Sequence, residues 1–256
     1  MHPKYSPIFW SGLRPCAETE NEETMSSKPY PLVCLPFAGS GAGFYRSWAE
    51  IPTNGITVLP MQLPGREELF LDDPFTDVIE AAAYLATRIA DLTAEMPSFG
   101  LFGHSLGAVL CYEIARELER AGHRGLAHLY VSGSPGPCNG RDIRATGLDD
   151  AGFLERVQEF AGYRHEAFDD PGLRELLLPV LRADVAMHEN YKPAPEAHLR
   201  VPVTSLRGEE DALVTREHAL QWRDVTEADF TYLELSGGHM YLVDSPEVLL
   251  RTIAGS

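Results

Sequence analysis

Cysteine is scarce in this chain, and the few that occur are not paired. The 256 residues include 4 cysteines, with no CxxC spacing among them. A domain of this length buries roughly three-quarters of the surface that its unfolded chain exposes, so it needs no disulfide bonds to be stable. We therefore interpret the cysteines as reduced thiols, which are typical of a reducing compartment. They are Cys16, Cys34, Cys111 and Cys138.

Long apolar runs are absent as well. No segment approaches the ~18 consecutive apolar residues that a membrane-spanning helix needs. The first 30 residues contain Pro3, Pro7 and Pro15, and no continuous apolar stretch of the kind that secretory signals carry. We therefore expect a soluble protein of the cytoplasm, with no membrane partner.

Positive charge is in short supply. Lys and Arg number 21 against 38 Asp and Glu, so the formal net charge is −17 at pH 7. A chain this acidic repels phosphate groups, so it is a poor general binder of anionic membranes, and we expect no nucleic-acid partner. The hydrophobic fraction of 44% and the charged fraction of 23% are those of an ordinary globular protein.

The sequence divides into a polar leader and one long domain. Residues 1–28 include a stretch rich in glutamate and serine without periodicity, which predicts a mobile leader. Over residues 29–256, short apolar runs that end in Gly or Pro alternate with helical patterns. This alternation is typical of an α/β domain with a mostly parallel central sheet and helices on both faces. The predicted strands cover residues 32–35, 56–59, 100–102, 127–131, 203–206 and 230–235.

Three helices are predicted from their periodicity and end signals. Apolar residues recur at helical spacing over 78–92, which indicates one buried stripe. A second helix is predicted over 106–121, with Gly122 in a C-terminal capping position. A third is predicted over 246–253, with Ser245 as its N-cap and proline in its first position.

Residues 136–199 interrupt the alternation of strands and helices. They contain two helical patterns and no convincing strand between them. The second pattern begins at Asp170-Pro171, and Pro179 should kink or split it, because proline lacks the N–H that a helix interior needs. We expect this insertion to form a lid over the site. The alternative is a packing element that gates nothing.

The most informative motif is Gly103-His104-Ser105-Leu106-Gly107. It follows a predicted strand and opens a predicted helix, which is the context of a nucleophile elbow. Such a turn holds the serine hydroxyl at the tip of the strand, and glycine two positions before and after it removes a clash. We therefore predict that Ser105 is a nucleophile. The alternative is a glycine-flanked turn with an idle serine.

A serine hydroxyl needs a base to become reactive, and the base needs an acid to orient it. In enzymes with this elbow the order along the chain is serine, acid, histidine. His239 follows the last predicted strand in a Ser-Gly-Gly-His turn and is the predicted base. Asp211 follows the strand at 203–206 and is our choice of acid. The neighbouring Glu209 and Glu210 remain alternatives for that role.

Two backbone N–H groups should stabilise the oxyanion that forms when a serine attacks a carbonyl. One is expected from Leu106, after the nucleophile, and the other from the glycine-rich loop after the first strand, where we choose Ala38 over Phe37. That loop does not match a nucleotide-binding fingerprint, because Phe44 stands where glycine is required. Histidines and cysteines show no metal-ligand spacing, so we expect neither a cofactor nor a metal.

Several short motifs follow one another in a fixed order from residue 31 to the C-terminus. They are Pro36-Phe37-Ala38-Gly39, Phe44-Tyr45-Arg46, Leu63-Pro64-Gly65-Arg66, the serine elbow, Gly208-Glu209-Glu210-Asp211 and Gly237-Gly238-His239. Together they resemble the type II thioesterases of polyketide and nonribosomal peptide pathways. The stretch 176–184 is similar to the lid helix of that family. One departure is Gly39-Ser40, where a pair of glycines is more usual.

This resemblance implies an α/β-hydrolase fold and a function. The activity would be hydrolysis of acyl thioesters on the phosphopantetheine arm of acyl or peptidyl carrier proteins. Its role would be to remove stalled or wrong acyl groups so that the synthase can restart. The resemblance also implies a monomer, and it agrees with Ser105, Asp211 and His239 as the catalytic residues.

A carrier protein is typically acidic, so a chain of net charge −17 should meet it slowly. We therefore expect the contact to use a local basic spot. Arg46 and Arg66, in loops near the expected mouth of the site, are the candidates. The alternative is that these arginines order the backbone of their loops.

Other functions remain open on the same scaffold. A general carboxylesterase or lipase would use the same three catalytic side chains on esters of simple alcohols. A cyclising thioesterase would release a macrocycle instead of an acid. A non-catalytic binding module would keep the fold without using Ser105.

Overall fold

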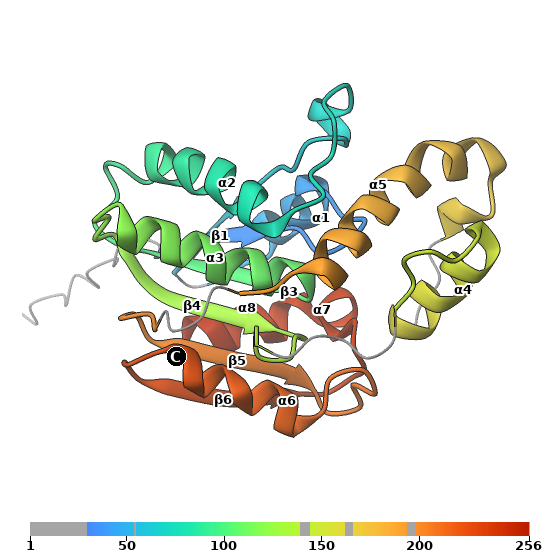
Figure 1. Cartoon of the computed structure of the whole chain (residues 1–256). Coiled ribbons are helices and arrows are strands. Elements are labelled where there is room, and N and C mark those ends of the chain that lie inside the picture. The colour runs from blue at the N-terminus through green and yellow to red at the C-terminus, as the bar shows by residue number, and fades with distance from the viewer. Residues whose placement is uncertain (1–29, 54, 139–143, 162–165, 194–197, 256) are drawn as a thin grey trace, which may run out of the picture.

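The computed structural model describes residues 30–53, 55–138, 144–161, 166–193 and 198–255. Within them, strands form one sheet in the order β2-β1-β3-β4-β5-β6, and all neighbouring strands run parallel (Figure 1). Each predicted strand is present and ends within two residues of its expected bounds. The strands are β1 (Tyr30–Leu35), β2 (Ile56–Pro60), β3 (Phe99–His104), β4 (Leu126–Ser132), β5 (Val203–Gly208) and β6 (Phe230–Leu235).

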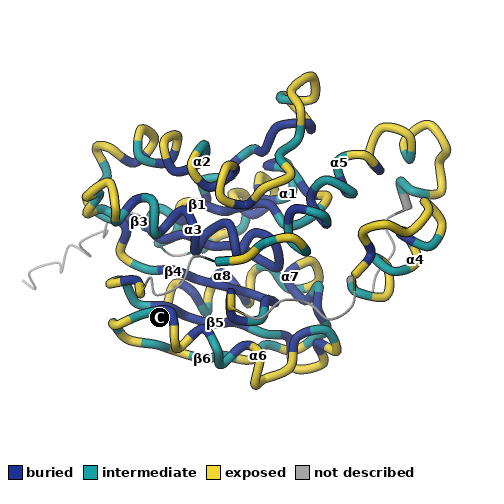
Figure 2. Tube along the Cα trace, viewed as in Figure 1, coloured by how far each residue is buried: buried dark blue, intermediate teal, exposed yellow. Residues whose placement is uncertain are grey.

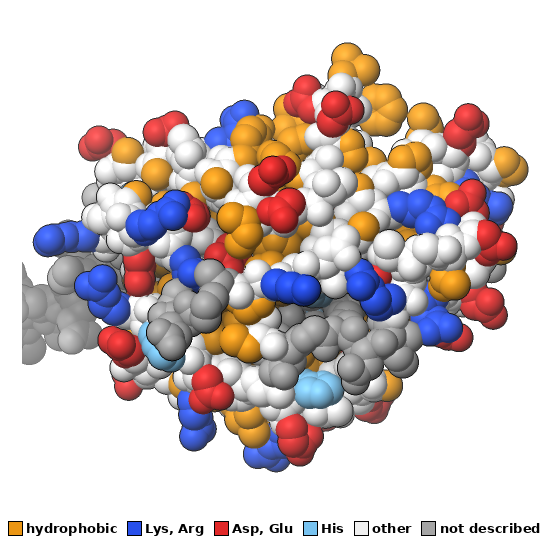
Figure 3. Space-filling view, in the orientation of Figure 1, with side chains coloured by type: hydrophobic (Ala, Val, Ile, Leu, Met, Phe, Trp, Pro, Cys, Tyr) orange, Lys and Arg blue, Asp and Glu red, His pale blue; other side chains and the backbone are white. Residues whose placement is uncertain are grey.

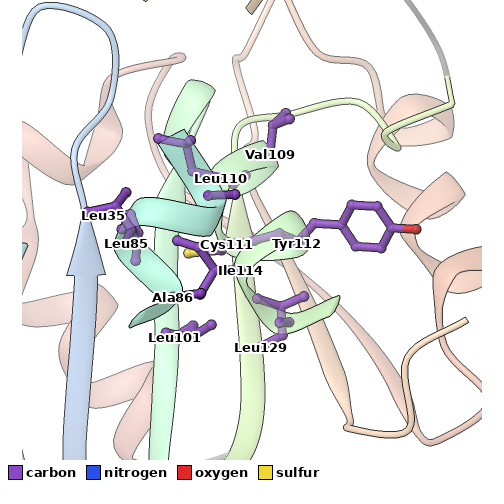
Figure 4. Packing of buried hydrophobic residues seen from close by; sticks show 14 of the residues in the cluster. Leu35, Leu85, Ala86, Leu101, Val109, Leu110, Cys111, Tyr112, Ile114 and Leu129 are labelled. Carbon is purple, nitrogen blue, oxygen red and sulfur yellow. The ribbon is translucent and has the colours of Figure 1, made fainter. Parts of the chain in front are cut away.

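One face of the sheet is covered by α2 (Val78–Leu92) and α3 (Leu106–Arg120). Alternate residues of β1, Val33 and Leu35, join this cluster because successive side chains of a strand point to opposite faces. Figure 4 shows how side chains from both helices pack with those of β1, β3 and β4. Truncating a buried leucine here, such as Leu85, would cost about 2–5 kcal/mol of stability.

The opposite face is covered by short helices from both ends of the chain. Leu32 and Cys34, the other residues of β1, pack here. Strand β1 is therefore buried on both sides, which is why its residues 32–35 are apolar throughout rather than alternating. The predicted mostly parallel sheet with helices on both faces is confirmed. The helices on this face are α1 (Ala42–Arg46), η1 (Ser47–Glu50), α7 (Tyr241–Asp244) and α8 (Pro246–Ala254).

The predicted end signals act as expected at α3 and differently at α8. Gly122 has φ +77°, and its N–H donates to the carbonyl of Glu119 at 3.0 Å. The N–H of His123 donates to the carbonyl of Leu118 at 2.9 Å, which completes a Schellman cap. At α8 the helix starts where expected, but within the described residues Ser245 makes no capping bond with its side chain.

Between β4 and β5 the chain forms the predicted helical insertion. It contains α4 (Asp150–Ala161), η3 (Glu166–Phe168) and α5 (Pro171–Asn190), and it stands to one side of the sheet in Figure 1. The start of α5 is confirmed, because the Asp170 side chain accepts a hydrogen bond from the N–H of Leu173 at 2.9 Å.

Of the two expected effects of Pro179, a kink or a split, the split is wrong, and the kink stays a prediction. α5 continues through this proline as a single helix. Leu178 and Leu181, on either side of it, are buried in a third hydrophobic cluster with Phe153 of α4. Packing of these side chains holds the helix together where the missing N–H of proline would otherwise end it.

Burial follows the layers of the fold, with mostly buried residues in the central strands and many exposed residues in the insertion and the loops (Figure 2). Residues 1–28, the predicted leader, lie outside the described residues, so the division into leader and domain stays a prediction. In the described part of the chain, no helix combines the length and the apolar character needed to cross a membrane. The remaining short elements are η2 (Glu67–Leu69), α6 (Arg216–Leu220) and η4 (Gln221–Val225).

Candidate active site

Ser105 lies in a sharp turn between a buried strand and a helix. β3 ends at His104 and α3 begins at Leu106, the expected first oxyanion donor. Ser105 has φ +53° and ψ −113°, a conformation that costs a non-glycine residue on the order of 1–3 kcal/mol. Its N–H donates to the carbonyl of Ser132 at 2.8 Å, which helps to hold the turn. The strand–turn–helix context predicted for the elbow is therefore present.

Glycine at positions 103 and 107 is required by the packing around this turn. A Cβ on Gly103 would lie 2.0 Å from the carbonyl oxygen of Gly107, and a Cβ on Gly107 would lie 2.7 Å from that of Leu35. Both contacts are with backbone atoms, which cannot move without displacing a strand or a helix. The glycine spacing of the motif thus follows from the close approach of α3 to β3 and β1.

His239 and Asp211 come together from two loops at the same edge of the sheet. Asp211 follows β5 and His239 follows β6, and these strands are parallel neighbours whose carboxyl ends meet. Nδ1 of His239 lies 2.8 Å from Oδ2 of Asp211. The other oxygen of Asp211 accepts the N–H groups of Leu213 at 2.8 Å and Val214 at 3.0 Å. The carboxylate is therefore held on both of its oxygens.

The electrostatics favour the ionised form of Asp211. Burial raises the pKa of its carboxyl, but hydrogen bonds from His239 and from the backbone of Val214 and Leu213 lower it by more. The net pKa lies below its ordinary value of 3.8, so the group is ionised at neutral pH. The alternatives Glu209 and Glu210 are exposed at the surface.

Ser105 and His239 line one cavity with a volume of about 760 Å³. Much of the remaining wall comes from α4, η3 and α5, so the insertion encloses the space in front of the serine. Among the described residues, no group of His, Cys, Asp and Glu side chains could hold a metal ion. The apolar part of the wall includes Phe37, Leu154, Val157, Phe160, Phe168, Leu177, Leu181 and Val185.

The loop after β1 is fixed by its own hydrogen bonds. The N–H and the Oγ of Ser40 both donate to the carbonyl of Phe37, at 3.0 Å and 2.9 Å. The N–H of Gly39 donates to Oδ2 of Asp184 at 2.8 Å, so it is already engaged. Ala38 lines the cavity beside the serine, and Ala38 and Phe37 remain the candidates for the second oxyanion donor.

His104 contacts the predicted base, and no motif in the sequence indicates this contact. The centroids of the His104 and His239 rings are 4.8 Å apart. Nδ1 of His104 lies 2.9 Å from Oγ of Ser132, which lies 2.7 Å from the hydroxyl of Tyr241. A buried polar network therefore lies beside His239. In the sequence, the one sign of this contact is that His104 stands at the end of an apolar strand, where the residues of the site gather.

The prediction that Arg66 forms a basic docking spot is wrong. Its side chain is 8% exposed and forms a bidentate ion pair with Asp184, at 2.7 Å and 2.8 Å. It orders the backbone instead. Arg46 is exposed, but it pairs with Glu67 at 3.2 Å and with Glu68 at 2.5 Å, which offset its charge. On the face shown in Figure 3, acidic and basic side chains are interspersed rather than separated into a basic patch.

Comparison with known proteins confirms the family resemblance. A model of the thioesterase domain matches residues 30–256. The gramicidin S biosynthesis protein GrsT of Aneurinibacillus migulanus is 30% identical over 228 residues, which are 88% of each chain. The thioesterase PikA5 of Streptomyces venezuelae is 34% identical over 213 residues, which are 83% of this chain and 75% of PikA5.

A solved structure agrees with these relatives. The type II thioesterase BorB from the borrelidin biosynthetic cluster matches this fold with a TM-score of 0.76 and 32% identity. The match covers 89% of this chain and 90% of BorB. The chain therefore belongs to the thioesterase family and is a hydrolase that acts on thioester bonds.

Proposed function

We propose that this protein is a type II thioesterase that releases acyl groups from the phosphopantetheine arm of acyl or peptidyl carrier proteins. It acts in polyketide or nonribosomal peptide biosynthesis, where it removes stalled or wrong acyl groups so that the synthase resumes. GrsT is named for gramicidin S biosynthesis and BorB for the borrelidin cluster, and these names support this class of pathway. Ser105 is the nucleophile, His239 the base and Asp211 the acid.

The first step transfers the acyl group to the enzyme. His239 removes the proton of the Ser105 hydroxyl, and the serine oxygen attacks the thioester carbonyl. The N–H groups of Leu106 and Ala38 stabilise the oxyanion. When this intermediate collapses, the carbon–sulfur bond breaks and the imidazolium protonates the departing thiolate. The carrier leaves as a free thiol, and the acyl group remains on Ser105 as an ester.

The second step releases the acyl group as a carboxylic acid. His239 takes a proton from a water molecule, whose oxygen attacks the ester carbonyl. The same two N–H groups stabilise the second oxyanion, and its collapse breaks the bond to the Ser105 oxygen. That oxygen regains the proton from the imidazolium. Throughout, Asp211 accepts the hydrogen bond of Nδ1–H and stabilises the imidazolium charge.

One observation carries this proposal: the strained Ser105 and His239 line the same cavity, and Asp211 contacts the Nδ1 of that histidine from behind the cavity wall. The wall formed by the insertion is largely apolar, which suits an acyl chain more than a polar substrate. We therefore assign α4, η3 and α5 of the insertion as a lid that covers the acyl group and excludes bulk water.

A substrate panel tests this function. An acyl-carrier thioester, the matching acyl-pantetheine thioester and the matching simple ester are given to the wild type, to Ser105→Ala and to Ser47→Ala as an exposed control. We expect the wild type and the control to favour the thioesters, with the carrier-bound form hydrolysed best. Ser105→Ala should lose about 10³-fold or more in kcat. A fluorophosphonate probe should label Ser105.

Each competing function has its own outcome in the same panel. Faster hydrolysis of the simple ester would identify a general esterase instead. A macrocyclic product from a linear thioester would identify a cyclising enzyme. Failure of the probe to label Ser105, together with undiminished turnover by Ser105→Ala, would remove this residue from the mechanism.

A further inference from the structure

Arg66 and Asp184 form a buried ion pair between segments that are 118 residues apart. The carboxylate of Asp184 is 0% exposed. Its Oδ2 lies 2.7 Å from Nη1 of Arg66, and its Oδ1 lies 2.8 Å from Nη2. The guanidinium also donates to the carbonyls of Ser40 at 2.9 Å and Pro64 at 3.3 Å. This two-pronged geometry fixes the orientation of both side chains.

The pair joins three parts of the molecule. Arg66 belongs to the loop after β2, and Asp184 belongs to α5 of the insertion. Through the N–H of Gly39, at 2.8 Å, Oδ2 of Asp184 also holds the loop after β1. Gly39 is the neighbour of Ala38, whose N–H we assign to the oxyanion hole.

The contact between α5 and this loop is tight as well as polar. A Cβ on Gly39 would lie 2.9 Å from Cδ1 of Leu181, one helical turn before Asp184. Gly39 itself has φ +79°, a left-handed conformation that suits glycine. The position of α5 and the path of the loop are therefore set together.

We propose that Asp184 is a positioning residue for the oxyanion hole: through Gly39 and Arg66 it holds the loop that carries Ala38 at the distance the oxyanion requires. Because Asp184 lies on α5, placement of the lid and completion of the oxyanion hole are coupled. This inference rests on the proposed function, since it assigns Ala38 to the transition state. It predicts that the pair acts on the chemical step more than on substrate binding.

The test compares Asp184→Asn with Asp150→Asn. Asp150 of α4 is a matched control, because it pairs at 2.7 Å with Arg182 of α5, the helix that carries Asp184. Its side chain is 71% exposed and does not reach the loop after β1. Kinetics with an acyl-pantetheine thioester are normalised to the number of active sites that a fluorophosphonate titrates. We expect Asp184→Asn to lower kcat per active site about 10- to 100-fold with KM changed less than about threefold. Asp150→Asn should keep both values.

Arg66→Lys is the second variant, because it keeps the charge and loses the bidentate geometry. We expect the same selective loss of kcat, whether or not Asp184→Asn folds well. An unchanged kcat per active site in the variants that fold would overturn the proposal, as would a rise in KM without a fall in kcat. Absence of thioester turnover by the wild type would instead reject the proposed function. In that case, the rates at which the fluorophosphonate labels Ser105 in each variant would test the role of Asp184 without any thioester turnover.

Discussion

Nδ1 of His239 and Oδ2 of Asp211 lie 2.8 Å apart, and both residues are buried. The backbone N–H groups of Leu213 and Val214 hold the second oxygen of the carboxylate. The carboxylate therefore cannot rotate freely, and its contact with Nδ1 decides which ring nitrogen carries the proton. Two predictions follow from this arrangement, one on catalysis and one on acid stability.

Asp211→Asn should lower kcat by about 10³- to 10⁴-fold, because an amide neither selects the same tautomer nor stabilises the imidazolium. KM should change much less, since the side chain lies behind His239. Steady-state kinetics on an acyl-pantetheine thioester measure both values. Glu209→Gln and Glu210→Gln are the controls, because both carboxylates are exposed in the same loop. If either control lowered kcat as much as Asp211→Asn does, the catalytic acid could not be assigned to Asp211.

The same substitution should change how stability depends on pH. The pKa of Asp211 is lowered in the folded protein, so its ionised form stabilises the fold above an unfolded-state pKa near 3.8. That contribution is lost as the pH falls through the folded-state pKa. The difference in unfolding free energy between wild type and Asp211→Asn should therefore narrow as the pH falls below the unfolded-state pKa and through the lower folded-state pKa. Urea denaturation at each pH measures it, and a difference that widened on acidification would contradict the sign.

Much of the fold and of the candidate site follows from local signals. Parallel strands place their carboxyl ends along one edge of a sheet, so residues just after β3, β5 and β6 are neighbours whatever the intervening chain does. Ser105, Asp211 and His239 could be chosen for that reason. The capping role of Gly122 was equally local, because it depends on a few adjacent residues.

What could not be predicted depends on long-range packing. Nothing near Arg66 in the sequence indicates that its partner is Asp184, and an arginine in a loop is more often exposed. The continuity of α5 through Pro179 has a related cause, because burial of Leu178 and Leu181 outweighs the local preference of proline. The contact of His104 with His239 likewise arises only when β3 and the last loop meet.

Tyr241→Phe should destabilise the protein by about 1–2 kcal/mol, the effect of losing a buried hydrogen bond. Its hydroxyl lies 2.7 Å from Oγ of Ser132, which in turn contacts His104. Burial raises the pKa of Tyr241, so the hydroxyl stays protonated and able to donate. A double-mutant cycle of Tyr241→Phe and Ser132→Ala by urea denaturation should give a coupling of about 1 kcal/mol. Strictly additive effects would show that the network is not a unit.

The glycines of the elbow allow a prediction that separates the stability cost of a steric clash from that of backbone strain. Gly107→Ala should cost about 3 kcal/mol, because its Cβ would lie 2.7 Å from the carbonyl oxygen of Leu35, a backbone atom of β1. Gly122→Ala is the matched control: φ is +77°, but within the described part of the chain no heavy atom beyond its two chain neighbours lies within 4 Å of the new Cβ. It should cost only about 1 kcal/mol, from the left-handed conformation alone.

The two variants should also differ in activity. A shift of β1 at Leu35 displaces the loop that begins at the next residue and carries Ala38, so Gly107→Ala should lower kcat in the fraction that remains folded. Gly122→Ala lies at the far end of α3 and should keep the wild-type kcat. Denaturation midpoints and kinetics per titrated active site measure the two effects separately. If Gly122→Ala proved the more destabilising of the two, the close approach of Gly107 to β1 would not be what requires glycine at that position.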